Sequence, residues 1–395
     1  MTTKTHTPKI RFTGFSESWI ERSIDEVLTE EKRNIQLIDT ESYELVTVRR
    51  RNEGVVSRGF LKGKDILVKN YFKVQAGDFL ISKRQIIHGA NGIIPQSLNN
   101  AIVSNEYLVI SGNENISTDF WALISRKPEM YRQFLLSSYG VDIEKMVFSV
   151  SDWRGRKITI PRLIEQTAIG NLFQNIDQTI TLQRRKYEQT QMLKKSLLSK
   201  MFPQKGQSQP EIRLKGFSGD WVEVKLGNVL LIRSMSVDSD DFDVDIELEN
   251  IESETGIIIG NTSVRTQANS YFARGDVLFG RLRPYLKKWW LADVEGVKSG
   301  EIWAFYSEMI ESEFIYALVQ TNAFLNATNV SSGSKMPRAD WSSMAKVKVF
   351  IPNSKKEQTA IGQFFKQLDD TVSIQAKQLK TLENLKKALL AKMFV

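Results

Sequence analysis

Basic side chains are the residues of this sequence whose types and positions best support a chemical role. Lysine and arginine neutralise phosphate groups, and the planar arginine fork can also donate two parallel hydrogen bonds to O6 and N7 of guanine. Several of them follow apolar segments in both halves of the chain, which favours contact with a nucleic acid. The candidates for DNA binding are Arg49, Arg50, Arg51, Lys83, Arg84, Arg281, Arg283, Lys287, Lys288, Lys335 and Arg338. For any single member, a solvated surface charge is an equally good interpretation.

The other reactive residues argue against an enzyme. The chain has no cysteine and only two histidines, His6 and His88, too few for a histidine metal cage or an acid–base pair. Residues 59–65 are one residue short of a phosphate-binding loop and end in aspartate instead of serine or threonine. The acidic residues between 241 and 252 partly resemble a calcium loop, but Ile246 stands where its sharp turn needs glycine. The sequence therefore predicts no catalytic residue, no cofactor and no metal. The acidic run is better interpreted as a loop held away from phosphates or as a contact to a basic partner.

Charge and composition set the broad class. The 395 residues are enough for two or three domains, and the balance of 54 basic to 46 acidic residues gives a net charge of +8. A pI near 9.3 favours a polyanionic partner, although alone it supports nucleic-acid binding only weakly. The lack of cysteine, of a signal-peptide core and of any long apolar run predicts a cytoplasmic protein without a membrane segment.

A repeated segment must position these residues. Residues 165–202 return as residues 357–394 with nearly half of the positions identical and no gap, which marks an internal duplication. Apolar residues at steps of three and four predict one long helix in each copy, with a stripe of the width that packs against another helix. The basic residues at 184–186 and 194–195 are better interpreted as a solvated helix face than as phosphate contacts. The stripes are most simply satisfied by pairing with each other, and the predicted pairing residues are Ile169, Ile176, Ile180, Tyr187, Leu193, Leu197, Ile361, Leu368, Val372, Leu379, Leu385 and Leu389.

The duplication extends to the whole chain. Residues 8–19, which open the first half, return as residues 210–221 after a segment rich in glycine, proline and polar residues. Each half is therefore a globular unit followed by a long helix. The predicted order is a first globular unit at 1–161, a helix at 162–203, a linker at 204–209, a second globular unit at 210–352 and a helix at 353–395.

The globular units combine strands and helices. Alternating apolar residues at 43–48 and 346–351 predict strands. We expect one helix near the end of each unit, at residues 119–139 and 311–327. The predicted fold class is α/β (α+β), with two strand-rich units and two long helices.

Particular motifs connect the chain to a known family. An Ile-Pro pair precedes Glu-Gln-Thr-Ala-Ile in both halves, Asp177 and Asp369 lie within the helices, and both helices end in Leu-Leu-x-Lys-Met-Phe. Each globular unit opens with Phe-x-x-x-Trp, which is Phe15 to Trp19 in the first half and Phe217 to Trp221 in the second. With these motifs the chain resembles the specificity subunit of a type I restriction-modification system. The resemblance covers the whole chain in its duplicated order, whereas the globular units match only at their ends.

The resemblance implies a function and partners. Two target recognition domains would lie at opposite ends of an antiparallel pair of long helices, related by approximate twofold symmetry. Each would read one half of a bipartite site in double-stranded DNA, and the helices would fix the unread spacer. A non-catalytic subunit of this kind recruits two DNA adenine methyltransferase subunits and then the ATP-dependent restriction subunits.

Two other classes of function remain open. A free-standing DNA-binding regulator would bind a specific site without a methyltransferase. A coiled-coil adaptor whose globular units bind proteins would show no salt-dependent affinity for duplex DNA, whereas a phosphate-neutralising protein loses affinity steeply as salt rises.

Overall fold

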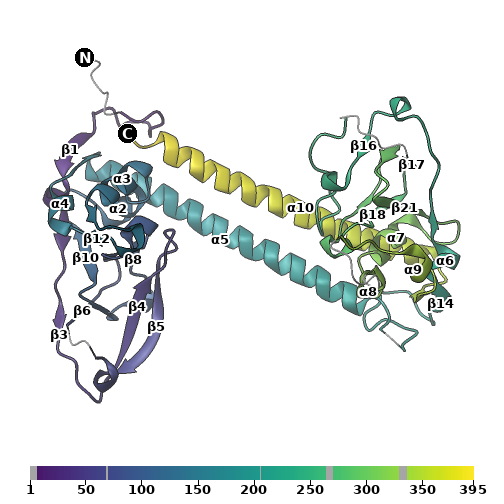
Figure 1. Ribbon diagram of the computed structural model, residues 1–395, viewed down its shortest axis with the longest axis horizontal. Helices are drawn as coiled ribbons and strands as arrows, with labels where there is room; N and C mark the ends of the chain where they lie inside the picture. Colours follow the sequence, from purple (N-terminus) through teal and green to yellow (C-terminus); the bar gives the residue numbers. More distant parts are fainter. Residues whose placement is uncertain (1–6, 68–69, 205, 264–269, 329–335) are drawn as a thin grey trace. The chain divides into compact units, whose positions relative to one another are not determined.

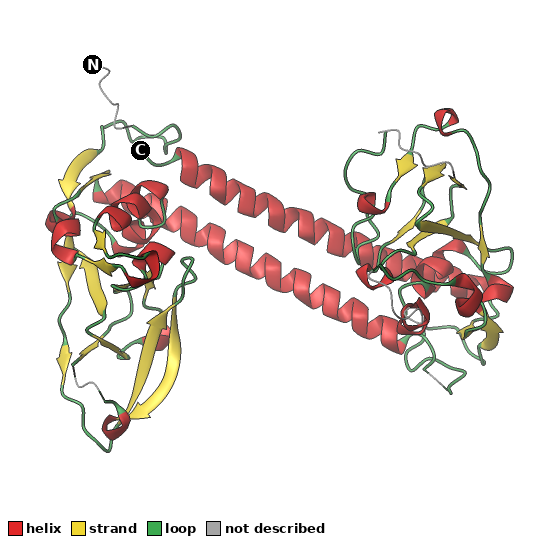
Figure 2. Ribbon diagram, in the orientation of Figure 1, coloured by secondary structure: helices red, strands yellow, loops and turns green. Residues whose placement is uncertain are grey.

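The computed structural model divides the chain into two compact units. Unit 1 comprises residues 1–179 and 383–395, and unit 2 comprises residues 180–382. Helices α5 (Leu163–Lys200) and α10 (Lys355–Lys392) each contribute to both units, which confirms the prediction of one long helix in each repeat (Figure 1). The mixed helix and sheet class is also confirmed (Figure 2). The structure describes residues 7–67, 70–204, 206–263, 270–328 and 336–395.

Unit 1 is built around a four-stranded antiparallel sheet in the order β2-β10-β7-β8. Its strands are Leu28–Glu30, Tyr107–Gly112, Phe79–Ser82 and Asn91–Ile93, respectively. Phe79, Leu80 and Ile81 of β7 are all buried. Such a continuous apolar run is typical of a strand covered on both faces.

A second sheet of unit 1 has five strands in the order β3-β6-β9-β4-β5. These strands are Asn34–Ile35, Tyr71–Lys73, Ile102–Ser104, Ser42–Val48 and Val55–Lys62, respectively. Strand β4 confirms the strand predicted at residues 43–48. Two further antiparallel pairs are β1 (Ile20–Ser23) with β13 (Lys157–Ile160), and β11 (Ser138–Tyr139) with β12 (Val147–Phe148).

The sheets of unit 2 repeat part of this plan. A four-stranded antiparallel sheet has the order β15-β21-β18-β19, and a three-stranded sheet has the order β16-β20-β17. Strand β14 (Val222–Lys225) pairs with β22 (Lys348–Ile351), which confirms the strand predicted near residue 350. The other strands, in chain order from β15 to β21, are Leu231–Ile232, Asp245–Ile246, Ser270–Phe272, Val277–Gly280, Trp289–Leu291, Gly296–Lys298 and Ile302–Tyr306.

The single helix expected near the end of each unit is wrong, because each is two helices. In unit 1, α2 (Thr118–Ile124) and α3 (Pro128–Leu136) replace it, and in unit 2, α7 (Ser312–Leu318) and α8 (Asn322–Thr328). Proline in the first turn of α3 lacks the N–H that would continue α2, so the chain starts a new helix there. The remaining short helices are α1 (Ile24–Val27), α4 (Val150–Arg154), α6 (Leu226–Val229) and α9 (Trp341–Met344). Among the described residues, no helix is long and apolar enough to cross a membrane.

The motifs at the ends of the long helices form the cores of the units. In unit 1, Phe394 packs edge-to-face on Trp19 at 6.1 Å between ring centroids. In unit 2, Phe202 packs in the same way on Trp221 at 5.8 Å. The repeated Lys-Met-Phe and Phe-x-x-x-Trp motifs therefore contribute the two aromatic partners of one contact in each unit.

The Glu-Gln pair at the start of each long helix holds the unit's opening segment. Glu165 accepts two hydrogen bonds from Arg11, and Glu357 accepts two from Arg213, with lengths between 2.6 and 2.8 Å. Both carboxylates are buried, and the two parallel hydrogen bonds from each arginine offset the free-energy cost of burying the charge. The amide of Gln166 accepts from the N–H of Ser117 before α2 and donates to the oxygen of Pro161, and Gln358 does the same in unit 2.

Within unit 2 the two long helices run antiparallel. Gln183 of α5 donates to Gln378 of α10 at 2.9 Å, and Lys194, further along α5, pairs with Asp369, nearer the start of α10. Asp369 is buried and also accepts from the phenol of Tyr316 at 2.6 Å. Burial raises the pKa of Asp369, and it raises the pKa of Tyr316 well above its ordinary value. In unit 1 the equivalent pair, Lys386 and Asp177, is more exposed.

The predicted pairing stripe differs from the structure at one position in each helix. Leu193 and Leu385 are exposed, and the next residue in each helix, Lys194 or Lys386, pairs with an aspartate of the other helix. The interpretation of Lys194 as part of a solvated face is therefore wrong. Lys194 lies seven residues after Tyr187, which places it on nearly the same side of the helix. Leu193 lies six residues after Tyr187 and is therefore about 120° away around the helix axis. The other predicted residues are buried or half-buried: Ile169, Ile176, Ile180, Tyr187, Leu197, Ile361, Leu368, Val372, Leu379 and Leu389.

Candidate nucleic-acid interface

Both units carry the same kind of turn directly after their central strand. In unit 1, β7 is followed by residues 83–90, which contain the 3-10 helix η2 (Ile86–His88) and lead into β8. In unit 2, β18 is followed by residues 281–288, which contain the 3-10 helix η7 (Pro284–Leu286) and lead into β19. We refer to residues 83–90 and 281–288 as the basic turns. Six of the eleven DNA-binding candidates lie on them: Lys83, Arg84, Arg281, Arg283, Lys287 and Lys288.

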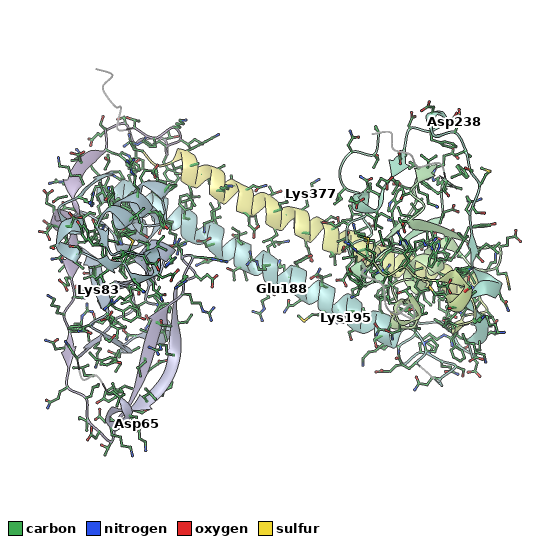
Figure 3. The ribbon with its side chains drawn as sticks, viewed as in Figure 1. Asp65, Lys83, Glu188, Lys195, Asp238 and Lys377 are labelled. Carbon is green, nitrogen blue, oxygen red and sulfur yellow. The ribbon has the colours of Figure 1, made fainter. Side chains whose placement is uncertain are left out.

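In unit 1 a second basic segment lies against the basic turn. The turn of the β4–β5 hairpin contains Arg49, Arg50 and Arg51, and the N–H of Arg51 donates to the oxygen of His88 at 2.7 Å. Arg51 and Asn52 have φ of 59° and 57°, the left-handed backbone that a tight hairpin turn requires. The structure thus brings these three arginines together with the turn that carries Lys83, which is labelled in Figure 3.

Several candidates in both units form exposed ion pairs. Arg50 pairs with Glu144 at 3.0 Å, and Arg84 pairs with Glu106 at 2.9 Å. Exposed pairs of this kind contribute about 0–1 kcal/mol to stability, so a phosphate could replace the carboxylate at little cost. The remaining pairs of this kind are Lys287 with Glu254 and Arg338 with Glu301.

In unit 2 the basic turn and a neighbouring loop converge. The backbone of Leu282 bridges to Arg338, which places that candidate beside the turn. The guanidinium of Arg281 lies 5.6 Å from the ring centroid of Trp303, a cation–π distance. Among the described residues, the Nε atoms of Arg281 and Arg283 are buried without a hydrogen-bond partner. The eleventh candidate, Lys335, lies outside the described residues.

Lys298 is a cation of this region that the sequence did not single out. It is the last residue of β20 and is 3% exposed, and its ammonium donates to the oxygen of Ile302 at 2.8 Å and to the hydroxyl of Ser270 at 3.0 Å. Burial is the main cause that lowers the pKa of Lys298 to about 8; the negative charge of Asp276 opposes this shift and the positive charge of Arg281 adds to it. No local pattern marks this residue, because its burial depends on strands that are distant in sequence.

Two more arginines missed by the sequence fix the start of the central strands. Arg33 forms paired hydrogen bonds to Asp78 at 2.6 and 3.1 Å, and Arg233 forms them to Asp276 at 2.6 and 2.9 Å. Each aspartate directly follows a glycine, Gly77 or Gly275, and both aspartates are buried. The repeat of this dipeptide was the available signal, but the arginine partners lie more than 40 residues away. The pairs hold β7 and β18, and with them the basic turns, in the same way in each unit.

The end of the acidic run meets the basic turn of unit 2, because Lys288 donates to the oxygen of Leu248 and Glu254 pairs with Lys287. Asp238, labelled in Figure 3, is exposed, as are Asp241 and Asp243. Within the described part of the chain, no cluster of acidic residues and histidines could hold a metal ion. Residues 184–186 and Lys195 of α5 are exposed.

Comparisons with known proteins match a family model to the second half of the chain. Residues 219–384 match the family model described as "Type I restriction modification DNA specificity domain". A curated relative, the type I restriction enzyme EcoDI specificity subunit of Escherichia coli, is 28% identical over 207 residues, which are 49% of this chain and 46% of that protein. The match thus spans about half the length of the curated relative. Unit 2 accordingly contains a type I restriction-modification DNA specificity domain.

Solved structures share the fold over nearly the whole chain. The type I restriction-modification S subunit of M. genitalium covers 98% of this chain and 99% of its own, with 15% identity and a TM-score of 0.62. A chain from work on complex assembly and conformational transition of the type I restriction-modification system covers 95% and 97%, with 17% identity and a TM-score of 0.50. The family match in the second half and the fold shared with solved specificity subunits both agree with the resemblance that the motifs carry.

Proposed function

We propose that this chain is the DNA-recognition subunit of a type I restriction-modification enzyme, in which each unit reads one half of a bipartite site in double-stranded DNA. The observation that carries the proposal is the repeated basic turn. Each unit holds its turn with the same buried Arg–Asp pair, yet the turns themselves carry different side chains. A constant frame that presents different residues is suited to reading two different half-sites.

The long helices supply the spacer in this proposal. Two readers joined by helices of fixed length select two half-sites at a fixed separation, because a helix rises about 1.5 Å per residue and does not stretch. The same helices carry exposed apolar residues beside the pairing seam. Leu182 and Leu193 are 61% and 52% exposed and lie 11 residues apart, about three full turns, so they share one face of α5.

That apolar face is the proposed docking surface for DNA adenine methyltransferase subunits. The second repeat has Ile374 and Leu385 at the equivalent positions of α10, 58% and 46% exposed. Two equivalent faces fit two copies of one partner. Recruitment of ATP-dependent restriction subunits would follow, and the chain itself would catalyse no reaction. We expect Leu182→Glu with Leu193→Glu to abolish co-purification of the methyltransferase, whereas Gln178→Glu with Gln189→Glu, on exposed polar positions of α5, should leave it intact.

The decisive experiment is a map of N6-methyladenine across the host genome with and without this gene. The proposal expects a bipartite motif of two fixed half-sites that is lost on deletion and restored by complementation. An identical methylation map in both strains, with the methyltransferase shown to be active, would refute the recognition role.

Two alternatives predict different binding behaviour. A free-standing regulator would bind a specific duplex with full affinity when purified alone and would leave methylation unchanged. A protein-binding adaptor would bind no duplex, at any salt concentration. The recognition subunit should bind duplex DNA with an affinity that falls linearly with the logarithm of salt concentration.

A further inference from the structure

The basic turns of the two units share a backbone and differ in what they expose. The N–H of Ser82 donates to the oxygen of Ala90 at 3.0 Å, and the N–H of Gly280 donates to the oxygen of Lys288 at 2.9 Å. Adding 198 to each number in unit 1 gives its counterpart in unit 2, and this relation also holds for the buried Asp78 and Asp276. The turns can therefore be compared residue by residue.

The residue after each 3-10 helix is left-handed in both units, but only one is glycine. In unit 1 it is Gly89, with φ of 72°, and its N–H donates to the oxygen of Ile86. In unit 2 it is Lys287, with φ of 51°, and its N–H donates to the oxygen of Pro284. Glycine takes this conformation freely, whereas a side chain with a Cβ does so at a cost. Unit 2 therefore keeps a strained lysine at a position where its own sister unit shows that glycine suffices.

The middle residue of the 3-10 helix differs in exposure, being buried in unit 1 and exposed in unit 2. Ile87 is 1% exposed and belongs to the hydrophobic core of unit 1. Its counterpart, Tyr285, is 56% exposed, although the preceding Pro284 remains buried. A large aromatic residue has been placed outside a turn that elsewhere points its apolar side chain inward.

The turn of unit 2 is held rigidly from both sides. Arg283, the second left-handed residue with φ of 50°, donates its N–H to the oxygen of Pro337 at 2.8 Å. The N–H of Glu254 donates to the oxygen of Lys287 at 2.8 Å, and the two side chains form an ion pair. Strained residues persist where the surroundings enforce them, and such sites are often functional.

We infer that Tyr285 is a specificity-determining residue of unit 2, which contacts a base edge of double-stranded DNA while Arg283 and Lys287 on either side hold the phosphate backbone. The inference rests on the proposed function. A tyrosine offers an apolar ring for the thymine methyl group and a hydroxyl that donates to or accepts from base edges. A rigid turn is required because discrimination between bases depends on the position of those few atoms. Tyr285 therefore reads sequence, and its two cationic neighbours fix the register.

The test is selection of duplex DNA from a random library by the full chain with the methyltransferase present, followed by affinity measurements on the selected duplex. Wild type should enrich a bipartite motif. Tyr285→Ala should keep one half-site unchanged and lose about tenfold of the base preference at one or two adjacent positions of the other. Tyr285→Phe separates the ring from the hydroxyl and should retain any preference that depends on the thymine methyl. Tyr131→Ala, at an exposed tyrosine of α3 in unit 1, is the matched control and should select the wild-type motif.

Lys287→Gly provides an independent variant that does not threaten folding. Because it restores the residue of the sister turn, its melting temperature should equal or exceed that of wild type. It should weaken binding to all duplexes about equally. The slope of the logarithm of affinity against the logarithm of salt concentration should fall by about one, the loss of one phosphate contact. A Tyr285→Ala variant that selects the wild-type motif with wild-type affinity overturns the inference and leaves the proposed function intact. Failure of wild type itself to bind any duplex, at low salt and with the methyltransferase present, overturns both.

Discussion

The duplicated helix pair allows a prediction in which the chain supplies its own control. Lys194 and Asp369 form an ion pair inside unit 2, with side chains 9% and 4% exposed, whereas Asp177, the aspartate of the equivalent pair in unit 1, is 45% exposed. The sequences of the two sites are nearly the same, so the difference in burial decides the energetics. Part of its origin is Tyr316, which covers Asp369 and donates to it.

Removing the lysine from the buried pair should be far more destabilising than removing it from the exposed pair. Lys194→Met leaves the buried carboxylate of Asp369 without its cationic partner, and breaking a buried pair in this way costs about 3–5 kcal/mol. Lys386→Met leaves Asp177 partly solvated, where the loss of a pair costs about 0–1 kcal/mol. Replacing both buried partners, Lys194→Met with Asp369→Leu, should recover most of the loss, because no uncompensated charge remains.

The pH dependence of the Lys194→Met variant has a definite sign. Burial already raises the pKa of Asp369 in the folded chain, and loss of the neighbouring ammonium raises it further. A group whose pKa is higher folded than unfolded contributes stability below its unfolded pKa, about 3.9, and loses it as pH rises through the folded pKa. The variant should therefore lose stability, relative to wild type, as pH rises above about 4.

Urea unfolding of the full chain, followed by hydrogen exchange on α10, is the measurement. Exchange assigns the loss to unit 2 even where the units unfold separately and a single free energy is not defined. Equal losses in Lys194→Met and Lys386→Met would refute the argument that burial sets the difference.

Three further predictions concern a second buried ion pair, the buried Lys298 and the length of the long helices. Arg213→Ala leaves the buried Glu357 without its partner and should lower the free energy of unfolding by about 3 kcal/mol in urea titrations. A loss below about 0.5 kcal/mol, the effect of an ordinary surface substitution, would contradict the importance of this buried pair. Because the pKa of Lys298 is lowered to about 8 in the folded chain, wild type should gain stability between about pH 8 and 9.5, and Lys298→Met should show no such gain in thermal melts. Insertion of a few residues within Thr179–Gln191 should lengthen the unread spacer in the methylation motif, and a changed half-site would refute the proposed spacer role.

Much of the fold could be predicted from the sequence because its signals are local or repeated. The long helices follow from a regular apolar period, and the duplication follows from direct comparison of the halves. Pro128 was a local signal for the interruption between α2 and α3. Proline is tolerated in the first turn of a helix, however, so its presence alone does not show that a new helix begins there. The burial of Lys298 and the arginine partners of Asp78 and Asp276 could not be predicted, since each depends on segments brought together only by the sheets.

Leu193 shows where hydrophobicity misleads even when the period is right. Its apolar character favours a place in the helix-pairing seam, although its position six residues after Tyr187 puts it on another side of the helix. The seam position is Lys194, whose charge argues against burial unless a partner is known. That partner, Asp369, is itself a charged residue in the other repeat, so neither residue alone reveals the pair. Geometry thus assigns the charged residues to the seam and leaves the leucines outside, and the exposed apolar face proposed for partner docking follows from the same angular argument.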